Sequence, residues 1–498
     1  MDGQHRNTPG QTGAKKAGPA GGTRTRRDPG GAGEHGRRTP AKRKPEGARE
    51  TALNVLERVD REGAYSGLEL NRTLNEAGLS RQDAALATEI AYGTIQRLNT
   101  IDYVLSDRVK GWPRKIEPWV RSLLRLSYYQ LRFLDRVPAH AVVAEAVNIA
   151  KRRGHAGIAG LVNGTLRGLL RDGVAPSLPD GLDEAERIAL VHSYPLWLVR
   201  RWLAAYGAAR TESLCAAGNE PPRASARVNR LRADRDRLLA EMAEAGIAAM
   251  PSKLSPDGIV AVRSGSLAAT PWYKDGLLTV QDESSMLVAA VADPRPGDRV
   301  LDCCAAPGGK TTQLAERMGD AGEVTANDIH AHKEALIREQ AARLGLGSIR
   351  TMTGDALDLA DRLPPLSMDV VLLDAPCSGL GVIRRKPEIK WNKRPEDIAA
   401  LAGLQRRLLE RASALVRPGG TLVYSTCTIA PEENEETIRH FLSSFPEFAL
   451  DPGWPEEAAR PLREAGVLTD AFEGMLQLLP DQFGSDGFFI ARLRRKEA

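Results

Sequence analysis

Apolar positions in the first third of the chain recur every three to four residues. Two such series are Ala52, Leu53, Leu56 and Val59, and further along Leu123, Leu126, Leu131 and Leu134. Side chains at this spacing share one face of an α-helix, and the strict alternation that marks a half-buried strand is absent. The pattern predicts an all-helical domain over residues 48–173.

The pattern changes after residue 173. Residues 174–222 contain further helical stretches such as YPLWLVRRWLAAYG and end at the turn signal NEPPR, so they are expected to form a helical linker. Residues 223–285 read as a strand, a helix and short strands, which predicts a small α+β domain of the RRM-like kind.

From about residue 286 to residue 498, strand-like runs alternate with helical stretches. The runs are DRVLDCC, EVTANDI, SIRTMTGDA, MDVVLLDAP, TLVYSTC and GFFIARL. This alternation predicts an α/β domain with a parallel, doubly wound, Rossmann-like sheet and right-handed crossovers. In such a sheet, ligands bind beyond the carboxyl ends of the strands.

Charge is unevenly distributed along the 498 residues. The net charge is +5, and residues 1–44 hold 11 of the 69 lysines and arginines but only 3 of the 64 acidic residues. The same segment has almost no large apolar residues, so residues 1–47 are expected to form a disordered basic tail. Such a tail either attracts nucleic-acid phosphates or is a solubilising extension.

Two further features narrow the class of protein. No apolar run approaches the roughly 18 residues that a membrane span needs, and the polar N-terminus has no signal peptide, so a soluble cytoplasmic protein is expected. The five cysteines include no C-x-x-C pair and the histidines form no H-E-x-x-H pattern, so neither a disulfide framework nor a metal site is expected. Thiols kept reduced in the cytoplasm are free to react.

The segment LDCCAAPGGKTT, residues 301–312, has the features of a cofactor-binding turn. It follows a strand and opens a helix, and Gly308 and Gly309 let the backbone approach a ligand beside the free N–H groups of the helix start. Asp328 lies 19 residues beyond Gly309 at the next strand end, where a carboxylate accepts the ribose hydroxyls. Asp355 follows the third strand and is placed to meet an adenine edge.

PGGKTT followed by VVLLDAP also imitates a phosphate-binding loop and a magnesium-binding aspartate, as in an ATPase. The pattern G-x-x-x-x-G-K-[ST] requires a glycine five residues before Gly309, and that position is Cys304. An adenosyl cofactor without a triphosphate fits the ribose-binding acid better. S-adenosyl-L-methionine is the usual cofactor for this alternation of strands and helices.

Two cysteines follow strand-like runs, Cys377 in DAPCSGLG and Cys427 in YSTCT. Together with CAAPGGKT and the ending DGFFIARL, these motifs resemble the RNA cytosine-C5 methyltransferase family. The segments AYGTIQR, LRLSYYQLRFLDRVPAHAVVAEAVNIAK and GLVNGTLRGLL resemble the RNA-binding NusB family, which narrows the resemblance to the branch that modifies 16S ribosomal RNA. The resemblance covers residues 48–495 and implies a class I methyltransferase sheet, S-adenosyl-L-methionine as cofactor, a monomer, and 16S rRNA as partner, either protein-free or early in assembly.

The chemistry of such a reaction explains why two thiols are useful. Cytosine C5 is a poor nucleophile, so a thiolate first adds to C6, and a base later removes the C5 proton. Spacing leaves open which cysteine attacks. The resemblance implies that Cys427 attacks and Cys377 assists product release, whereas analogy with DNA cytosine methyltransferases would give the attack to Cys377. It also implies that Asp374 holds the cytosine edge near the cofactor, and Lys310 is a candidate to favour the thiolate.

The expected cofactor site therefore comprises Cys304, Ala305, Ala306, Pro307, Gly308, Gly309, Lys310, Asp328, Asp355 and Asp374. Cys304 is expected to contribute its backbone only. Cys215 and Cys303 are expected to serve packing, which is the usual role of an isolated cysteine.

Residues 384–394, RRKPEIKWNKR, hold six basic residues and Trp391 directly after the Cys377 motif. Cations for phosphates and an aromatic ring for base stacking favour an RNA-contacting loop over a merely solvated one. Two other functions stay open: a tRNA cytosine-C5 methyltransferase on the same scaffold, and a non-catalytic RNA-binding assembly factor that uses the helical domain. Methylation of isolated tRNA would indicate the first, and failure to bind the cofactor would favour the second.

Overall fold

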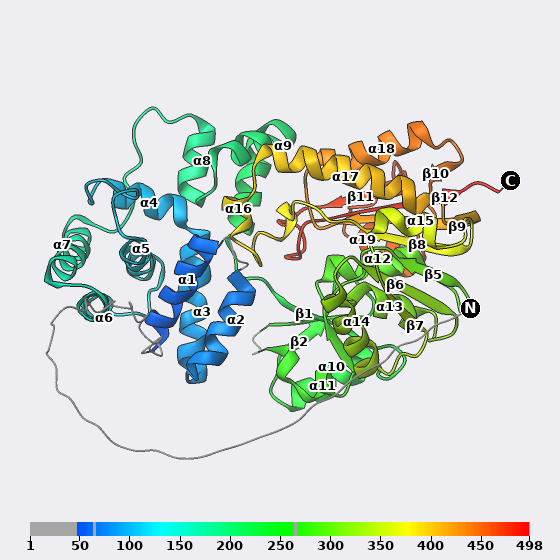
Figure 1. Cartoon of the computed structure of the whole chain (residues 1–498), viewed down its shortest axis with the longest axis horizontal. Helices are drawn as coiled ribbons and strands as arrows, with labels where there is room; N and C mark the ends of the chain where they lie inside the picture. The colour runs from blue at the N-terminus through cyan, green and yellow to red at the C-terminus, as the bar shows by residue number, and fades with distance from the viewer. Residues whose placement is uncertain (1–46, 63–65, 263–265, 498) are drawn as a thin grey trace, which may run out of the picture. The chain divides into compact units, whose positions relative to one another are not determined.

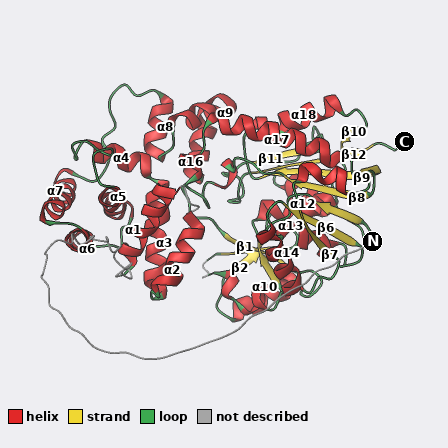
Figure 2. Cartoon of the chain, viewed as in Figure 1, coloured by secondary structure: helices red, strands yellow, loops and turns green. Residues whose placement is uncertain are grey.

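The structure is a computed structural model that describes residues 47–62, 66–262 and 266–497. The basic tail predicted for residues 1–47 lies outside these ranges up to residue 46. Within them the chain forms a helical region, then a small antiparallel sheet and a larger, mostly parallel sheet (Figure 1, Figure 2). This order of elements confirms the predicted fold class. None of the described helices is long and apolar enough to cross a membrane.

Amphipathic helices build the first region. They are α1 (Ala48–Glu62), α2 (Ser66–Ala77), α3 (Arg81–Gln96), α4 (Leu98–Ser106), α5 (Pro118–Phe133), α6 (Ala139–Arg153) and α7 (Ala156–Asp172). Leu53 of α1 and Leu123 and Leu126 of α5 are at most 1% exposed and lie in one shared apolar core. The apolar positions at helical spacing are therefore the buried faces of these helices, which confirms the helical prediction.

Two helices connect this region to the rest of the chain, α8 (Glu184–His192) and α9 (Leu196–Ala217). A capping box starts α8, because the Asp183 carboxylate accepts from the Glu186 N–H at 2.7 Å and the Glu186 carboxylate accepts from the Asp183 N–H at 3.0 Å. Apolar residues of both helices share a core with Leu380 and Ile429 from the last third of the chain. The predicted linker is thus packed against the larger sheet region.

A small four-stranded antiparallel sheet follows, with the order β2-β3-β1-β4. Its elements are β1 (Ala224–Val228), α10 (Arg235–Glu244), β2 (Ala249–Pro251), β3 (Gly258–Ala261), the 3-10 turn η1 (Leu267–Ala269), α11 (Pro271–Lys274) and β4 (Leu278–Val280). Leu238 and Met242 of α10 pack against Ala226 and Val228 of β1 in a separate apolar core.

The larger sheet has the strand order β10-β12-β9-β8-β5-β6-β7, and β11 pairs with β12 outside this path. Its strands are β5 (Arg299–Asp302), β6 (Glu323–Asp328), β7 (Ile349–Thr353), β8 (Met368–Asp374), β9 (Val416–Thr426), β10 (Phe448–Leu450), β11 (Met475–Leu478) and β12 (Phe488–Arg495). The five strands β9, β8, β5, β6 and β7 pair in parallel, as predicted.

The last strand-like run is the exception to the parallel pairing predicted for this domain. GFFIARL forms β12, which runs antiparallel to β9, with Phe489 opposite Thr426 and Leu493 opposite Leu422. The connection from β11 to β12 spans residues 479–487, which is shorter than the dozen or more residues that a parallel crossover needs. β12 therefore enters the sheet as the second strand of a hairpin.

Helices cover both faces of this sheet. The helical elements of this part of the chain are α12 (Glu283–Ala292), α13 (Gly309–Arg317), α14 (Ala331–Leu344), η2 (Ala356–Asp358), α15 (Leu359–Arg362), η3 (Leu380–Val382), α16 (Ile389–Asn392), α17 (Pro395–Ser413), η4 (Pro431–Glu433), α18 (Glu435–Ser444) and α19 (Glu456–Glu464). Val423 of β9 lies in the core that α12, α13 and α19 help to form, whereas Leu422 and Tyr424 lie in the core that α17 and α18 help to form. Successive side chains of a strand point to opposite faces, so the carboxyl ends of the strands lie between two helical layers.

Candidate active site

The expected site residues gather at the carboxyl ends of neighbouring parallel strands. Asp302 ends β5, Asp328 ends β6 and Asp374 ends β8, while Cys427 directly follows β9. Because Asp374 pairs in register with Ser425 of β9, the loops after β8 and β9 leave the sheet side by side. The structure therefore brings together the motifs that the sequence places more than a hundred residues apart.

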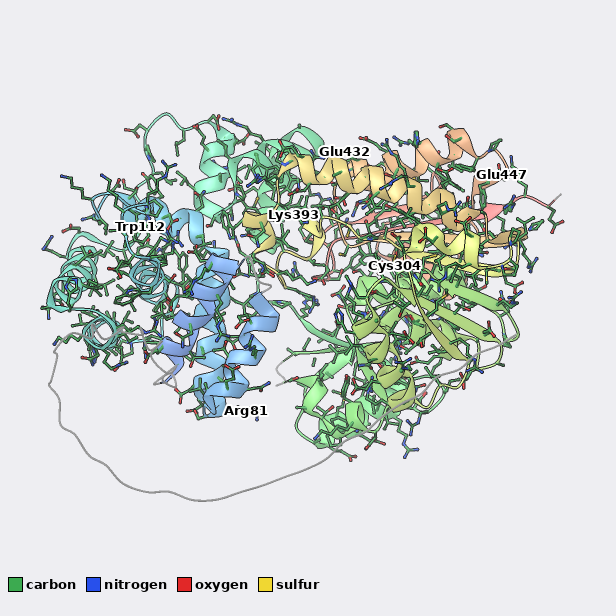
Figure 3. All side chains as sticks on the ribbon, in the orientation of Figure 1. Arg81, Trp112, Cys304, Lys393, Glu432 and Glu447 are labelled. Atoms are coloured by element: carbon green, nitrogen blue, oxygen red, sulfur yellow. The ribbon has the colours of Figure 1, made fainter. Side chains whose placement is uncertain are left out.

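The loop after β5 is hydrogen-bonded to the two strands that flank β5 in the sheet, β8 and β6. The Cys303 N–H donates to the Leu372 carbonyl at 2.9 Å, and the Ala305 N–H donates to the Asn327 carbonyl at 2.8 Å. Cys304 lies between them in this loop (Figure 3) and its thiol is mostly buried. Burial and nearby carboxylates raise the pKa of Cys304, so its side chain stays a neutral thiol and the loop offers mainly backbone groups.

The two glycines of this loop play different structural roles. Gly308 has φ of +102°, and a Cβ there would lie 3.3 Å from the Cα of Ile337, so both backbone strain and crowding exclude a side chain. Gly309 starts α13, and a Cβ there would meet nothing within 4 Å. The space beside Gly309 is therefore open, as close approach of a ligand to the backbone requires.

Two carboxylates flank this loop at strand ends. The Asp328 Oδ2 atom accepts from the Ala306 N–H at 3.3 Å, and its Oδ1 atom accepts from the His330 N–H at 3.0 Å. Asp355 accepts from the Leu357 N–H at 2.9 Å and so caps η2. Asp328 is thus oriented from both sides by backbone donors, with the Lys333 ammonium 3.7 Å away.

A charged pair lies between the loop and the cysteines. The Lys310 Nζ atom donates to Asp374 Oδ2 at 2.7 Å, and the Ser425 hydroxyl donates to Asp374 Oδ1 at 2.7 Å. Burial disfavours the charge on Lys310, but the hydrogen bond and charge of Asp374 outweigh it and raise the pKa of Lys310. Lys310 therefore stays an ammonium beside the thiols.

The two cysteines face each other at the ends of β8 and β9. Their Sγ atoms are 3.4 Å apart, and both cysteines are free thiols. The hydrogen bond from Cys377 lowers the pKa of Cys427 against the effect of burial, and Lys310 and Lys386 lower it further. The pKa of Cys377 is raised by the same hydrogen bond and by burial. The site thus favours a thiolate at Cys427 and a thiol at Cys377.

A buried carboxylate that the sequence analysis did not single out joins the two cysteine loops. Glu433 has no exposed surface and accepts from the Ser378 N–H at 2.8 Å, from the Ser378 hydroxyl, and from the Thr428 hydroxyl at 3.3 Å. Ser378 directly follows Cys377 and Thr428 directly follows Cys427, so one carboxylate fixes both loops. Within the sequence Glu433 belongs to the acidic run PEENEE, which is typical of a solvated helix start.

Cys303 and Cys215 are buried in apolar cores. Cys303 packs in the apolar core under α17, and Cys215 packs in the core formed with α8 and α9. Burial raises the pKa of Cys215 to about 12, so its thiol stays neutral. No group of three or more His, Cys, Asp and Glu side chains suited to a metal ion occurs among the described residues.

The expectation that residues 384–394 form an exposed RNA-contacting loop is wrong for its central residues. Arg384 is 3% exposed and donates to the carbonyls of Pro480 and Gly484. Lys390 is fully buried, and the Trp391 indole donates to the Ile95 carbonyl of α3 at 2.7 Å. Arg384, Lys390 and Trp391 therefore tie parts of the protein together, whereas Lys386 and Arg394 of the same segment are exposed.

The contacts of Lys390 explain how a lysine can be buried here. Its Nζ atom donates to the Gln96 carbonyl at 3.2 Å, the Ser193 carbonyl at 3.1 Å and the Asn219 side-chain oxygen at 2.7 Å, and it lies 3.6 Å from the centre of the Tyr194 ring. Burial lowers the pKa of Lys390, but three acceptors match the three N–H donors of an ammonium and the ring face adds a cation–π contact. Its partners come from the end of α3 and from the residues that directly follow α8 and α9.

Replacing Lys390 with methionine is expected to lower the free energy of unfolding by about 2–4 kcal/mol, because three buried acceptors lose their donor. The matched change Lys393→Met, three residues later in the same segment, is expected to alter it by less than about 0.5 kcal/mol. Urea titration of both variants measures the difference. An unchanged stability of Lys390→Met together with a weakened affinity for RNA would restore the interpretation as an RNA-contacting loop.

Family profiles match the chain in three successive segments. The profile described as the NusB family matches residues 46–171, and that of the RsmF/B-like methyltransferase ferredoxin-like domain matches residues 194–267. The profile described as 16S rRNA methyltransferase RsmB/F matches residues 289–494, which contain the loop after β5 and both cysteines.

Whole proteins are similar over most of this length. A protein of Bacillus subtilis (strain 168), named probable ribosomal RNA small subunit methyltransferase B, is 44% identical over 448 residues, which are 90% of this chain and 98% of that protein. A protein of Sodalis glossinidius (strain morsitans), named ribosomal RNA small subunit methyltransferase B, is 38% identical over 419 residues, 84% of this chain and 91% of that one. The crystal structure of PH0851 has a TM-score of 0.74 and 28% identity, and the match covers 89% of this chain and 98% of that one.

Proposed function

Because the chain belongs to the family described as 16S rRNA methyltransferase RsmB/F, we propose that it forms 5-methylcytidine in 16S rRNA with S-adenosyl-L-methionine as methyl donor. The observation that carries the proposal is the pair of thiols 3.4 Å apart beside the Lys310–Asp374 ion pair. An enzyme that methylates an oxygen or a ring nitrogen needs no covalent nucleophile, whereas methylation of cytosine C5 does. We further propose that the protein acts as a monomer on RNA that is protein-free or early in assembly.

The loop after β5 has the chemistry that an adenosyl cofactor needs. Open space at Gly309 admits a ligand to the backbone, and Asp328 offers carboxylate oxygens for ribose hydroxyls. Cys304, Ala305, Ala306 and Pro307 supply the rest of the loop, and Asp355 lies at the next strand end. When bound, the cofactor supplies an electrophilic methyl group.

The protein side of the reaction follows from the protonation states of the two cysteines. The Cys427 thiolate adds to C6 of the cytosine, which makes C5 nucleophilic. Asp374 holds the cytosine edge, while Lys310 donates a hydrogen bond to Asp374 and its charge favours the Cys427 thiolate. After methyl transfer a base takes the C5 proton, the bond between C6 and sulfur breaks, and Cys427 regains its electron pair. Cys377, in contact with this sulfur, assists that release.

Access to both faces of the base requires an unpaired or flipped cytosine. The helical region that matches the NusB family is the part we expect to hold the surrounding RNA. Lys386, an exposed residue whose charge reaches Cys427, is the member of the basic segment best placed to meet RNA at the mouth of the site.

Methyl transfer from radiolabelled S-adenosyl-L-methionine to unmodified 16S rRNA, followed by bisulfite sequencing, tests the proposal. The expected result is label in one 5-methylcytidine. Label in isolated tRNA alone would indicate a tRNA enzyme with the same chemistry. No label in either RNA, together with failure to bind the cofactor, would indicate a non-catalytic RNA-binding assembly factor.

Replacing Asp328 with asparagine is expected to weaken cofactor binding by about 10-fold to 100-fold, because hydrogen bonds to a charged acceptor are worth about 1.5–3 kcal/mol. The asparagine keeps the size of the side chain and an oxygen for the Ala306 N–H. Glu323→Gln, at the exposed opposite end of β6, is the matched control and should bind normally. Calorimetry with S-adenosyl-L-homocysteine measures both variants, and equal affinities would show that Asp328 does not hold the ribose.

A further inference from the structure

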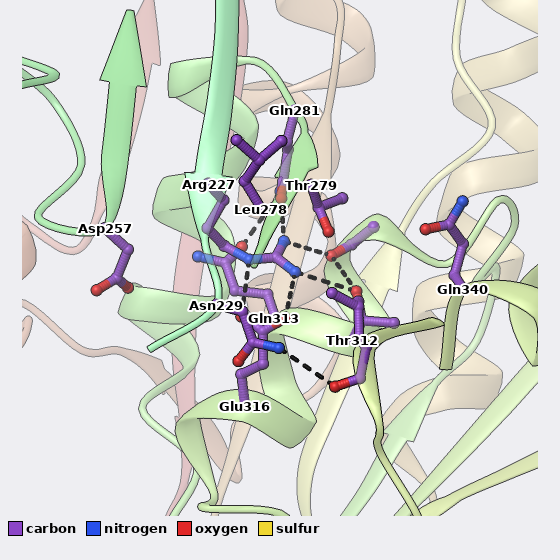
Figure 4. Close-up of polar contacts among 12 residues, drawn as sticks. Arg227, Asn229, Asp257, Leu278, Thr279, Gln281, Thr312, Gln313, Glu316 and Gln340 are labelled. Atoms are coloured by element: carbon purple, nitrogen blue, oxygen red, sulfur yellow. Dashed lines mark hydrogen bonds and ion pairs between the residues drawn. The ribbon is translucent and has the colours of Figure 1, made fainter. Parts of the chain in front are cut away.

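Arg227 of β1 is a buried arginine that lies outside the proposed catalytic groups. Its side chain is 1% exposed, although it belongs to the small antiparallel sheet and not to the larger sheet that carries the site. The partners of its guanidinium lie mainly on α13, the helix that starts at Gly309 (Figure 4). Arg227 therefore connects the small sheet to the loop after β5, residues 303–309, which we call the cofactor loop.

The guanidinium bonds both to the first turn of α13 and to a carboxylate further along it. Nη1 donates to the Gly309 carbonyl at 2.8 Å, and Nη2 donates to the Thr312 hydroxyl at 3.1 Å. Nε and Nη2 also form a two-pronged ion pair with Glu316, at 3.0 and 2.8 Å. Gln281 accepts a further bond from Nη1 and, through its own amide, donates to Gln313 at 3.2 Å.

These contacts extend to the turn of the loop itself. The Thr312 hydroxyl, which accepts from Arg227, donates to the Gly308 carbonyl at 2.9 Å. Gly308 is the residue with positive φ that packs against Ile337 without room for a Cβ. Arg227 is thus one hydrogen bond from Gly309 and two from Gly308.

A buried ion pair of this kind is not needed for a stable core. Taking Arg227 and Glu316 out of water is unfavourable, and two well-packed apolar side chains often fold at least as stably. What apolar side chains would not supply is the set of directed hydrogen bonds to Gly309 and Thr312. The network therefore contributes fixed geometry more than stability.

We propose that Arg227 is a positioning residue for the cofactor loop, and that the small sheet thereby raises the affinity for S-adenosyl-L-methionine. By holding the first turn of α13, Arg227 keeps the backbone of the loop in its binding conformation before the cofactor arrives. A preorganised loop loses less conformational freedom on binding. The inference rests on the proposed function, in which this loop binds the cofactor.

The decisive variants separate the loop contacts from the stability of the pair. Arg227→Lys keeps one positive charge beside Glu316 but cannot reach Gly309, Thr312 and Glu316 together. The double variant Arg227→Met/Glu316→Met removes the ion pair without leaving an unpaired buried charge. Arg317→Lys is the matched control, because the Arg317 side chain is 4% exposed on the same helix and pairs with Asp257 near β3 without touching the loop.

Calorimetry with S-adenosyl-L-homocysteine, with thermal unfolding run in parallel, provides the readout. We expect both Arg227 variants to bind about tenfold more weakly than the wild type, and Arg317→Lys to bind as tightly as the wild type. In methylation assays the KM for S-adenosyl-L-methionine should rise by a similar factor, whereas kcat at saturating cofactor should stay within about threefold of the wild type.

Other outcomes overturn the inference in distinguishable ways. Wild-type affinity in both Arg227 variants would show that the loop is positioned without Arg227. Equal weakening in Arg317→Lys would show that general loosening of the small sheet is responsible. Failure of the wild type itself to bind S-adenosyl-L-homocysteine would instead overturn the proposed cofactor site, and this inference with it.

Discussion

The Cys427→Ala variant is expected to lose methyl transfer by a factor on the order of 10⁴ or more, because the neighbouring Cys377 has a raised pKa and stays a thiol, which is a poor nucleophile. Cys427 lies 3.4 Å from Cys377, and its hydrogen bond and the charge of Lys310 favour the thiolate. The measurement is single-turnover transfer of radiolabelled methyl groups to unmodified 16S rRNA. Cys215→Ala, which removes a buried thiol that takes no part in the proposed reaction from the core around α8 and α9, should keep the wild-type rate.

The pH at which Cys427 and Cys377 react with an alkylating reagent should be shifted in opposite directions from that of an ordinary thiol. Because the pKa of Cys427 is lowered, its thiolate should persist at a lower pH than that of an ordinary thiol, and alkylation by iodoacetamide should begin there. Cys377, with a raised pKa, should react only at higher pH. Replacing Lys310 with methionine removes a positive charge and should shift the Cys427 profile upward. A Cys377 that reacts first would reverse the two assignments.

The Cys377→Ala variant is expected still to form the bond to C6 but to release its product slowly, by about 10²-fold to 10⁴-fold, as loss of an acid–base group typically does. Because the hydrogen bond that lowers the pKa of Cys427 is lost with Cys377, the attack itself should need a higher pH than in the wild type. The covalent complex between protein and RNA should then accumulate and survive a denaturing gel. Formation of the complex should need Cys427, so the double variant Cys377→Ala/Cys427→Ala is the control.

Two results would contradict this division of roles. A Cys377→Ala variant that turns over at the wild-type rate would remove Cys377 from product release. A Cys377→Ala variant that neither forms the complex nor methylates RNA, beside an active Cys427→Ala, would make Cys377 the nucleophile, as the analogy with DNA cytosine methyltransferases suggests.

Local patterns in the sequence predicted the elements that carry the site. Helical spacing marked the buried faces of α1 and α5, and strand-like runs marked the ends of β6, β8 and β9. Because parallel strands end at one edge, the positions of Asp328, Cys377 and Cys427 after these runs were enough to bring them to one place. These residues stood out in the sequence because each lies at, or within three residues of, the carboxyl end of a strand.

Features that depend on long-range contacts were not predictable in this way. The hydrophobic pattern of β12 does not differ from that of a parallel strand. The parallel direction predicted for β12 was therefore wrong, because β12 forms an antiparallel hairpin with β11. In the sequence, Glu433 and Arg227 look like solvated charges, because their neighbouring residues do not indicate that distant elements bury them. The prediction that the segment around Lys390 contacts RNA was wrong for the same reason, since the acceptors of the Lys390 ammonium lie on residues 96, 193 and 219.

The contacts of Lys390 and Trp391 with residues 95, 96 and 193 limit how the protein can be divided into stable fragments. A fragment that starts after α9 would retain the proposed catalytic groups but would leave the Lys390 ammonium without the Gln96 and Ser193 carbonyls and the Trp391 indole without Ile95. It would also uncover apolar residues such as Ile383 and Ile389, which α8 and α9 help to cover. We expect such a fragment to aggregate, because it exposes apolar surface. A loss of RNA methylation on deletion of the residues up to the end of α9 would therefore reflect low solubility before it reflects lost RNA recognition.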